Sequence, residues 1–197
     1  MHIGRMLAIG AAAAFVLLAP SRGHAQNITY SEVYLGVLAH DVHFLGGKEH
    51  GIDINPEFIF ASPIDDATMM SVPEIFRWMV QPRPTIGAIA NTSGYTDQAY
   101  LGATWTWQLA HGMFKPDDGL TFGIFFGPGF NDGKLHSNQD DRKNLGSHIL
   151  FRESFELGYK FNPTWTISAY LDHISNGGLA KYNQSINNFG GRIGFRF

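Results

Sequence analysis

The stretch Thr164-Trp165-Thr166-Ile167-Ser168-Ala169-Tyr170-Leu171-Asp172-His173-Ile174-Ser175 alternates between two kinds of side chain. Every second position is apolar as far as Leu171, and the positions between them carry hydroxyl groups or an acid. Because successive side chains of a β-strand point to opposite faces, the stretch predicts a strand with one apolar and one polar face. His173 and Ser175 fall on the apolar face, where polar side chains are unexpected.

Seven further segments alternate in the same way, and turn-rich sequence separates them. They are residues 29–41, 51–60, 84–90, 100–109, 120–127, 149–159 and 189–197. Eight alternating strands of about ten residues are typical of a small antiparallel barrel. We therefore expect an all-β fold, an eight-stranded antiparallel transmembrane β-barrel formed by residues 26–197 as one domain.

The polar faces distinguish a membrane barrel from a soluble one. A soluble barrel of the lipocalin type turns its apolar face inward, whereas a membrane barrel turns that face towards lipid. Here the polar faces carry many charged residues, and glycines between them suit a narrow interior. These charged residues are Glu32, Asp53, Glu57, Arg152, Glu156, Arg192 and Arg196. The chain also ends on an aromatic strand with Phe197 last, as bacterial outer-membrane barrels do, so the outer-membrane barrel is favoured.

The N-terminus resembles a secretory signal peptide. Arg5 precedes an apolar run over residues 6–19, and Gly23-His24-Ala25 provides the small residues of a cleavage site. Residues 1–25 are therefore expected to be removed. The sequence has no cysteine, so the exported domain must be stable without disulfides. A formal net charge of -3 argues against nucleic acid as a partner.

An even number of strands places both ends of the mature barrel in the periplasm. The outer loops are then expected around residues 41–50, 91–97, 131–146 and 175–187. The inner connection over residues 62–83 is long, and within it Ser71-Val72-Pro73-Glu74 resembles the start of a short interfacial helix.

Strand parity places three polar residues on the outside of the barrel near its outer rim. His173 and Ser175 continue the lipid-facing side of their strand, and Asn187 shares the parity of the apolar residues that follow it. A serine nucleophile, a histidine base and an asparagine that holds the second imidazole nitrogen form a workable set for acyl transfer. The alternative is that these residues only form the polar collar where strands meet loops.

The residues His173-Ile174-Ser175-Asn176-Gly177-Gly178-Leu179, with Asn183 and Asn187, resemble the PagL family of lipid A 3-O-deacylases. The resemblance extends through Asn55-Pro56-Glu57, Pro82-Arg83-Pro84 and residues 151–156. It implies a hydrolase in the bacterial outer membrane that acts on lipid A of lipopolysaccharide, with His173 and Ser175 as catalytic residues and no cofactor. That family commonly has a glutamate twelve residues after the serine, where this chain has Asn187.

The same motif, with asparagine twelve residues after serine, also resembles outer-membrane phospholipase A. Barrels of that family have twelve strands, so the chain length favours the deacylase. A phospholipase-like esterase and a non-enzymatic structural or adhesive barrel remain the alternative functions. The sequence leaves homodimerisation open.

Two further parts of the site follow from spacing. If a three-residue loop at residues 162–164 pairs Phe161 with Trp165, Glu153 lies opposite His173 and is an alternative to Asn187 as the group that orients the imidazole. Asn176, Gly178 and Asn183 are candidates for the oxyanion donors.

Metal binding is a weak alternative use of the outer loops. His40, Asp41, His43 and His50 cluster in the first of them. Asp132, Asp140 and Asp141 stand in the third, where a divalent ion could link them to lipid head groups. Mixed loop histidines more often only contact solvent, so we expect no metal site.

Overall fold

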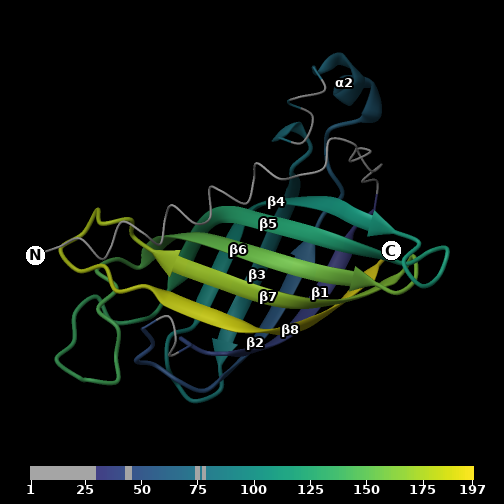
Figure 1. Ribbon diagram of the computed structural model, residues 1–197. Coiled ribbons are helices and arrows are strands. Elements are labelled where there is room, and N and C mark those ends of the chain that lie inside the picture. Colours follow the sequence, from purple (N-terminus) through teal and green to yellow (C-terminus); the bar gives the residue numbers. More distant parts are fainter. Residues whose placement is uncertain (1–29, 43–45, 74–75, 77–78) are drawn as a thin grey trace, which may run out of the picture.

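Eight antiparallel strands close into one barrel, each paired with the next and β8 paired with β1 (Figure 1). The computed structural model describes residues 30–42, 46–73, 76 and 79–197, so the predicted signal peptide lies outside the described residues. The strands are β1 Glu32–Ala39, β2 Ile52–Ile59, β3 Arg83–Asn91, β4 Gln98–His111, β5 Gly119–Asn131, β6 Ile149–Lys160, β7 Trp165–Ser175 and β8 Ile186–Arg196. The eight-stranded barrel predicted from the alternation is confirmed.

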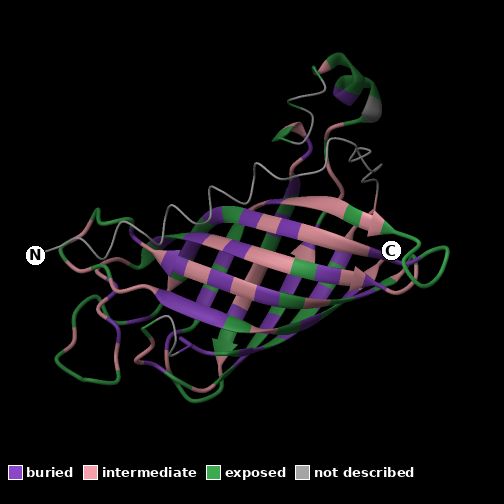
Figure 2. Ribbon diagram, in the orientation of Figure 1, coloured by how far each residue is buried: buried purple, intermediate pink, exposed green. Residues whose placement is uncertain are grey.

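Burial alternates along the strands in the sense that a membrane barrel requires (Figure 2). On β1, the apolar side chains Leu35 and Val37 are 53% and 55% exposed, whereas Glu32 is 5% exposed. Arg83 and Arg152 are fully buried in the interior. The apolar surface therefore faces outward, and the charged residues line the lumen.

Ion pairs and aromatic rings fill the lumen. Arg192 lies 2.6 Å from Glu57 through Nη2 and 3.0 Å from Glu156 through Nε. Arg83 lies 2.6 Å from Glu32 through Nη1. Buried charges require partners of this kind, because an unpaired charge away from water is costly. A cluster of buried apolar side chains packs among the ion pairs: Leu38, Ile89, Tyr100, Phe125 and Tyr170.

The two ends of the barrel differ. Four loops lie at the end away from the C-terminus: L1 (residues 40–51), L2 (92–97), L3 (132–148) and L4 (176–185) (Figure 1). The connections at the opposite end span residues 60–82, 112–118 and 161–164. This arrangement agrees with the predicted positions of the outer loops.

The long connection between β2 and β3 contains the short helix α2, Asp66–Ser71, which stands outside the barrel wall (Figure 1). Asp65 caps the helix, because its carboxylate accepts a hydrogen bond from the Thr68 amide. The helix predicted to follow Ser71 includes residues 74–75 and 77–78, which lie outside the described residues. Further along, the Trp105 indole of β4 donates to the Met79 carbonyl at 3.0 Å and holds the connection against the barrel. Among the described helices, none combines the length and apolar character needed to cross a membrane.

A second apolar cluster closes the barrel beneath the loops. Leu145 of L3 packs there with Leu150, Ile174 and Ile186, and each of the four is at most 3% exposed. Ile174 separates His173 from Ser175 in sequence and points inward, so the inward packing of β7 fixes the outward direction of its two neighbours.

Candidate active site on the lipid-facing rim

His173 and Asn187 form a direct hydrogen bond between neighbouring strands. They are register partners on β7 and β8, and Nδ1 of His173 lies 2.7 Å from Oδ1 of Asn187. An amide oxygen can only accept a hydrogen bond, so Nδ1 carries the proton. In the neutral ring this leaves the Nε2 lone pair free to act as a base.

Ser175 lies two residues further along β7, opposite Phe151 of β6. It shares the outward face with His173, and both side chains are partly exposed. Within the described part of the chain, no hydrogen bond joins the Ser175 hydroxyl to the imidazole. Catalytic hydrogen bonds of this kind often form only when substrate is bound.

Glu153 lies directly opposite His173 on β6, in the register that the three-residue connection after Phe161 predicts. Its Oε1 lies 4.0 Å from Nε2 of His173, and the two side chains are 43% and 32% exposed. Glu153 therefore approaches the nitrogen that faces away from Asn187. Asn187, and not Glu153, contacts Nδ1, the nitrogen through which a third residue would orient the ring.

L4 forms a compact turn immediately after Ser175. The Asn176 amide donates to Oδ1 of Asn183 at 2.8 Å, and Oδ1 of Asn176 accepts from the Gly178 amide at 2.9 Å. Nδ2 of Asn176 donates to the carbonyls of Leu145 and Tyr182. The three predicted oxyanion candidates thus lie together, but the amides of Asn176 and Gly178 are used within the turn.

Two donors of the same turn have no partner among the described residues: the Gly177 amide and Nδ2 of Asn183. Gly177 and Gly178 have φ angles of 63° and 84°, in the left-handed region that glycine adopts readily. Two consecutive glycines after the serine are the sequence signal for this turn. Gly177 is therefore a further candidate donor.

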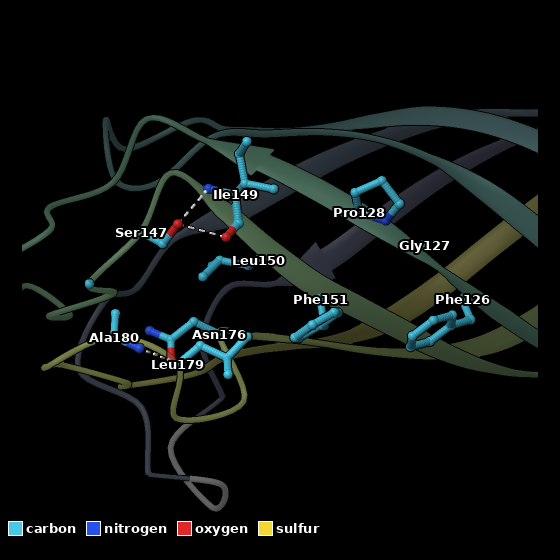
Figure 3. A pocket seen from close by; sticks show the side chains of 11 residues that line it. Phe126, Gly127, Pro128, Ser147, Ile149, Leu150, Phe151, Asn176, Leu179 and Ala180 are labelled. Carbon is cyan, nitrogen blue, oxygen red and sulfur yellow. Dashed lines mark hydrogen bonds between the residues drawn. The ribbon is translucent and has the colours of Figure 1, made fainter.

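An apolar groove runs from this turn along the outer wall of β5 and β6 (Figure 3). Its volume is about 480 Å³. Phe126 and Phe151 line one end of it, and Leu179 and Ala180 of L4 line the other. Because Phe151 is the register partner of Ser175, the groove lies beside the serine and provides space for a hydrocarbon chain.

Several of the residues weighed as metal ligands have other partners. His40 is buried between Glu49 of L1 and Asp53, at 3.1 Å and 2.9 Å. His50 packs against Tyr95, and the Tyr95 hydroxyl donates to Asp141. In residues 30–42, 46–73, 76 and 79–197, no group of three acidic, histidine or cysteine side chains is placed to hold a metal ion, and His43 lies outside these ranges.

The contact between His40 and Glu49 shifts the pKa of both side chains. Burial alone would lower the pKa of His40, but hydrogen bonds to the Asp53 and Glu49 carboxylates outweigh it and raise the pKa to about 9. Burial would raise the pKa of Glu49, but hydrogen bonds from His40, Lys143 and Thr96 lower it to about 2. The pair is therefore charged at neutral pH and ties L1 to L2 and L3.

Comparison with known proteins assigns the family. The family model described as lipid A 3-O-deacylase (PagL) matches residues 76–196, more than half of the chain. The solved structure of the outer membrane enzyme PagL covers 83% of this chain and 97% of that chain at 15% identity, with a TM-score of 0.58. The N-terminal β-barrel domain of Pseudomonas aeruginosa OprF covers 87% and 100% at 10% identity, with a TM-score of 0.50. No curated protein matched the sequence. The chain belongs to the PagL family of lipid A 3-O-deacylases, ester hydrolases of the outer membrane.

Proposed function

We propose that this protein hydrolyses the ester that joins a 3-hydroxyacyl chain to position 3 of lipid A, with Ser175 as nucleophile and His173 as base. The observation that carries the proposal is the 2.7 Å hydrogen bond from His173 Nδ1 to Asn187, formed on the lipid-facing wall beside Ser175. Polar side chains on such a surface are energetically costly, so their presence there supports a functional role.

The first half of the reaction transfers the acyl chain to the enzyme. His173 Nε2 takes the Ser175 hydroxyl proton while Oγ bonds to the ester carbonyl carbon. The carbonyl oxygen becomes an oxyanion, for which the Gly177 amide and Asn183 Nδ2 are the free donors. When the carbon–oxygen bond to the sugar breaks, the imidazolium returns its proton to the sugar oxygen.

The second half releases the fatty acid. Water gives a proton to His173 and attacks the acyl-serine, and Ser175 then regains its proton as the carboxylic acid leaves. Asn187 keeps the imidazole in the required tautomer without placing a second charge against lipid. As a neutral group, it stabilises the imidazolium less than a carboxylate would.

The position of the site selects the class of substrate. A carbonyl at this rim, with its chain in the groove bounded by Phe126 and Phe151, belongs to a lipid of the outer leaflet. Lipid A presents an ester at this depth. A phospholipid does too, and the asparagine at position 187 is the residue type of the phospholipase motif.

The decisive experiment is mass spectrometry of lipid A from cells that express the wild-type protein or the Ser175→Ala variant. We expect lipid A to lose one 3-hydroxyacyl chain only with the wild type, while both proteins give a folded barrel on a heat-modifiability gel. Unchanged lipid A together with fatty-acid release from phospholipid would favour the phospholipase. No release from either lipid would favour a structural barrel.

A further inference from the structure

We propose that Lys181 of L4 and His136 of L3, placed around the ring of Tyr182, bind a phosphate of the lipid A headgroup and so orient the ester at Ser175. The inference rests on the proposed function and specifies which part of the substrate the loops recognise.

The first observation is the geometry of the cluster. The rings of His136 and Tyr182 stack with their centroids 4.4 Å apart and an interplanar angle of 4°. Nζ of Lys181 lies 5.4 Å from the centre of the Tyr182 ring. The ring of Tyr182 is thus contacted by one side chain from L3 and one from L4.

The second observation connects this cluster to the L4 turn that follows Ser175. The Tyr182 carbonyl accepts a 2.6 Å hydrogen bond from Nδ2 of Asn176, the residue after Ser175. The neighbouring segment of L3 is held as well, because Gln184 and Asn144 exchange two hydrogen bonds. A ligand held at Lys181 would therefore be fixed relative to the nucleophile.

The third observation is the separation of charge within the loops. Among the described residues, neither Lys181 nor His136 forms an ion pair with an acid. Two acids of L3 are turned towards L2: Asp141 accepts from the Tyr95 hydroxyl, and Asp132 accepts from the Asp97 amide. Next to the turn after Ser175, Lys181 is therefore a cation without an acidic partner among the described residues.

Phosphate is the ligand that this arrangement fits. The cluster lies at the membrane rim, next to an apolar groove for the acyl chain, and lipid A is a phosphorylated glucosamine lipid. A lysine that lacks an acidic partner, with an imidazole nearby that can donate a further hydrogen bond, favours an anion with several acceptor oxygens. Each cation near an anionic lipid surface contributes about 5-fold to binding.

The test compares lipid A with lipid A dephosphorylated by phosphatase, both in neutral-detergent micelles. Lys181→Met should lower the wild-type rate on phosphorylated lipid A by about 5-fold below saturation and leave the dephosphorylated rate unchanged. Lys181→Arg should retain the wild-type preference. Lys48→Met removes the same charge from L1 and should behave as wild type.

The proposal would be overturned if Lys181→Met lowered the rate equally on both lipids, or if Lys48→Met had the same effect as Lys181→Met. Either result would mean that Lys181 does not recognise the phosphate specifically. Inorganic phosphate tests whether the site binds the free anion instead of the lipid headgroup. If millimolar phosphate raises the unfolding temperature of the wild type but not of Lys181→Met, while the Ser175→Ala variant binds phosphorylated and dephosphorylated lipid A equally, the site binds the free anion and the headgroup assignment is wrong.

A binding experiment distinguishes failure of this inference from failure of the proposed reaction. The inactive Ser175→Ala variant should still bind phosphorylated lipid A more tightly than dephosphorylated lipid A, and Lys181→Met should abolish that difference in the same background. If the wild type releases no fatty acid but the binding preference persists, only the proposed function fails. If release proceeds and both lipids bind equally, only the phosphate site fails.

Discussion

Oδ1 of Asn187 lies 2.7 Å from Nδ1 of His173, and this contact joins β8 to the strand that carries Ser175. A neutral amide thus stands twelve residues after the serine, at the position that we propose orients the imidazole. The imidazole is held in one tautomer without a buried or lipid-facing negative charge at Nδ1.

The first prediction concerns Asn187 itself. Asn187→Ala should lower the rate of acyl release by roughly 10- to 100-fold, because the imidazole loses the acceptor that fixes its tautomer and position. Asn187→Glu should keep activity within roughly 10-fold of wild type, since a carboxylate accepts from Nδ1 in the same way. Release of 3-hydroxy fatty acid from lipid A measures both. Equal activity of the alanine variant and the wild type would contradict the orienting role.

The second prediction concerns Glu153, which faces the opposite nitrogen. Glu153→Gln should lower the rate by less than Asn187→Ala, because Oε1 lies 4.0 Å from Nε2 and does not touch Nδ1. The same assay decides the order of the two effects. A larger loss in Glu153→Gln would make the glutamate the third member of the site.

The third prediction concerns Ser175. Ser175→Ala should abolish acyl release, with a fall of at least roughly 1000-fold, because no other group supplies the nucleophile. The variant should unfold at the wild-type temperature, since the hydroxyl has no hydrogen-bond partner among the described residues. Residual activity near that of the wild type would exclude the serine mechanism.

The fourth prediction concerns the lumen. Arg192→Met should destabilise the barrel by about 3–5 kcal/mol, because Glu57 and Glu156 would remain buried without their shared cation. Adding Glu57→Gln and Glu156→Gln should recover part of the loss. Urea unfolding in detergent, followed on a heat-modifiability gel, measures it. As a control, Ile193→Leu on the adjacent outward face should cost under about 1.5 kcal/mol.

The barrel and the pairing of Glu153 with His173 were predictable because both depend on short-range rules. Side-chain alternation assigns faces, and the short connection after Phe161 fixes the register of β6 against β7. Leu145 was not predictable in this way. It belongs to a loop, and its burial under the site depends on Ile174 and Ile186, which come from two strands that follow it in sequence.

Which hydrogen-bond donors remain free in the L4 turn after Ser175 could be determined only from the structure. The glycines after Ser175 predicted a turn with exposed amides, but not which amides the turn consumes itself. Asn176 engages its own amide, its side-chain nitrogen and its side-chain oxygen within L3 and L4. That leaves Gly177, rather than Gly178, with a free amide.

The fifth prediction follows from the charged pair of His40 and Glu49 under the outer loops. The pKa of His40 is raised from 6.5 to about 9, so its contribution to stability is complete below about pH 6.5 and is lost as pH rises through about 9. The pKa of Glu49 is lowered from 4.5 to about 2, so its contribution is present above about pH 4.5 and is lost as pH falls through about 2. The loops should therefore be held most firmly between about pH 4.5 and 6.5.

Limited proteolysis tests the alkaline side of this window. Trypsin cleavage after Lys143, whose amide donates to Glu49 at 3.0 Å, should accelerate in the wild type as pH rises through about 9. His40→Gln removes the titrating group, so its cleavage after Lys143 should be faster near neutrality and should lack this alkaline step. Cleavage of a small synthetic trypsin substrate in the same buffers corrects for the protease's own pH dependence. If the ratio of the two cleavage rates stays constant in the wild type across this range, the loops are not held by the His40 charge.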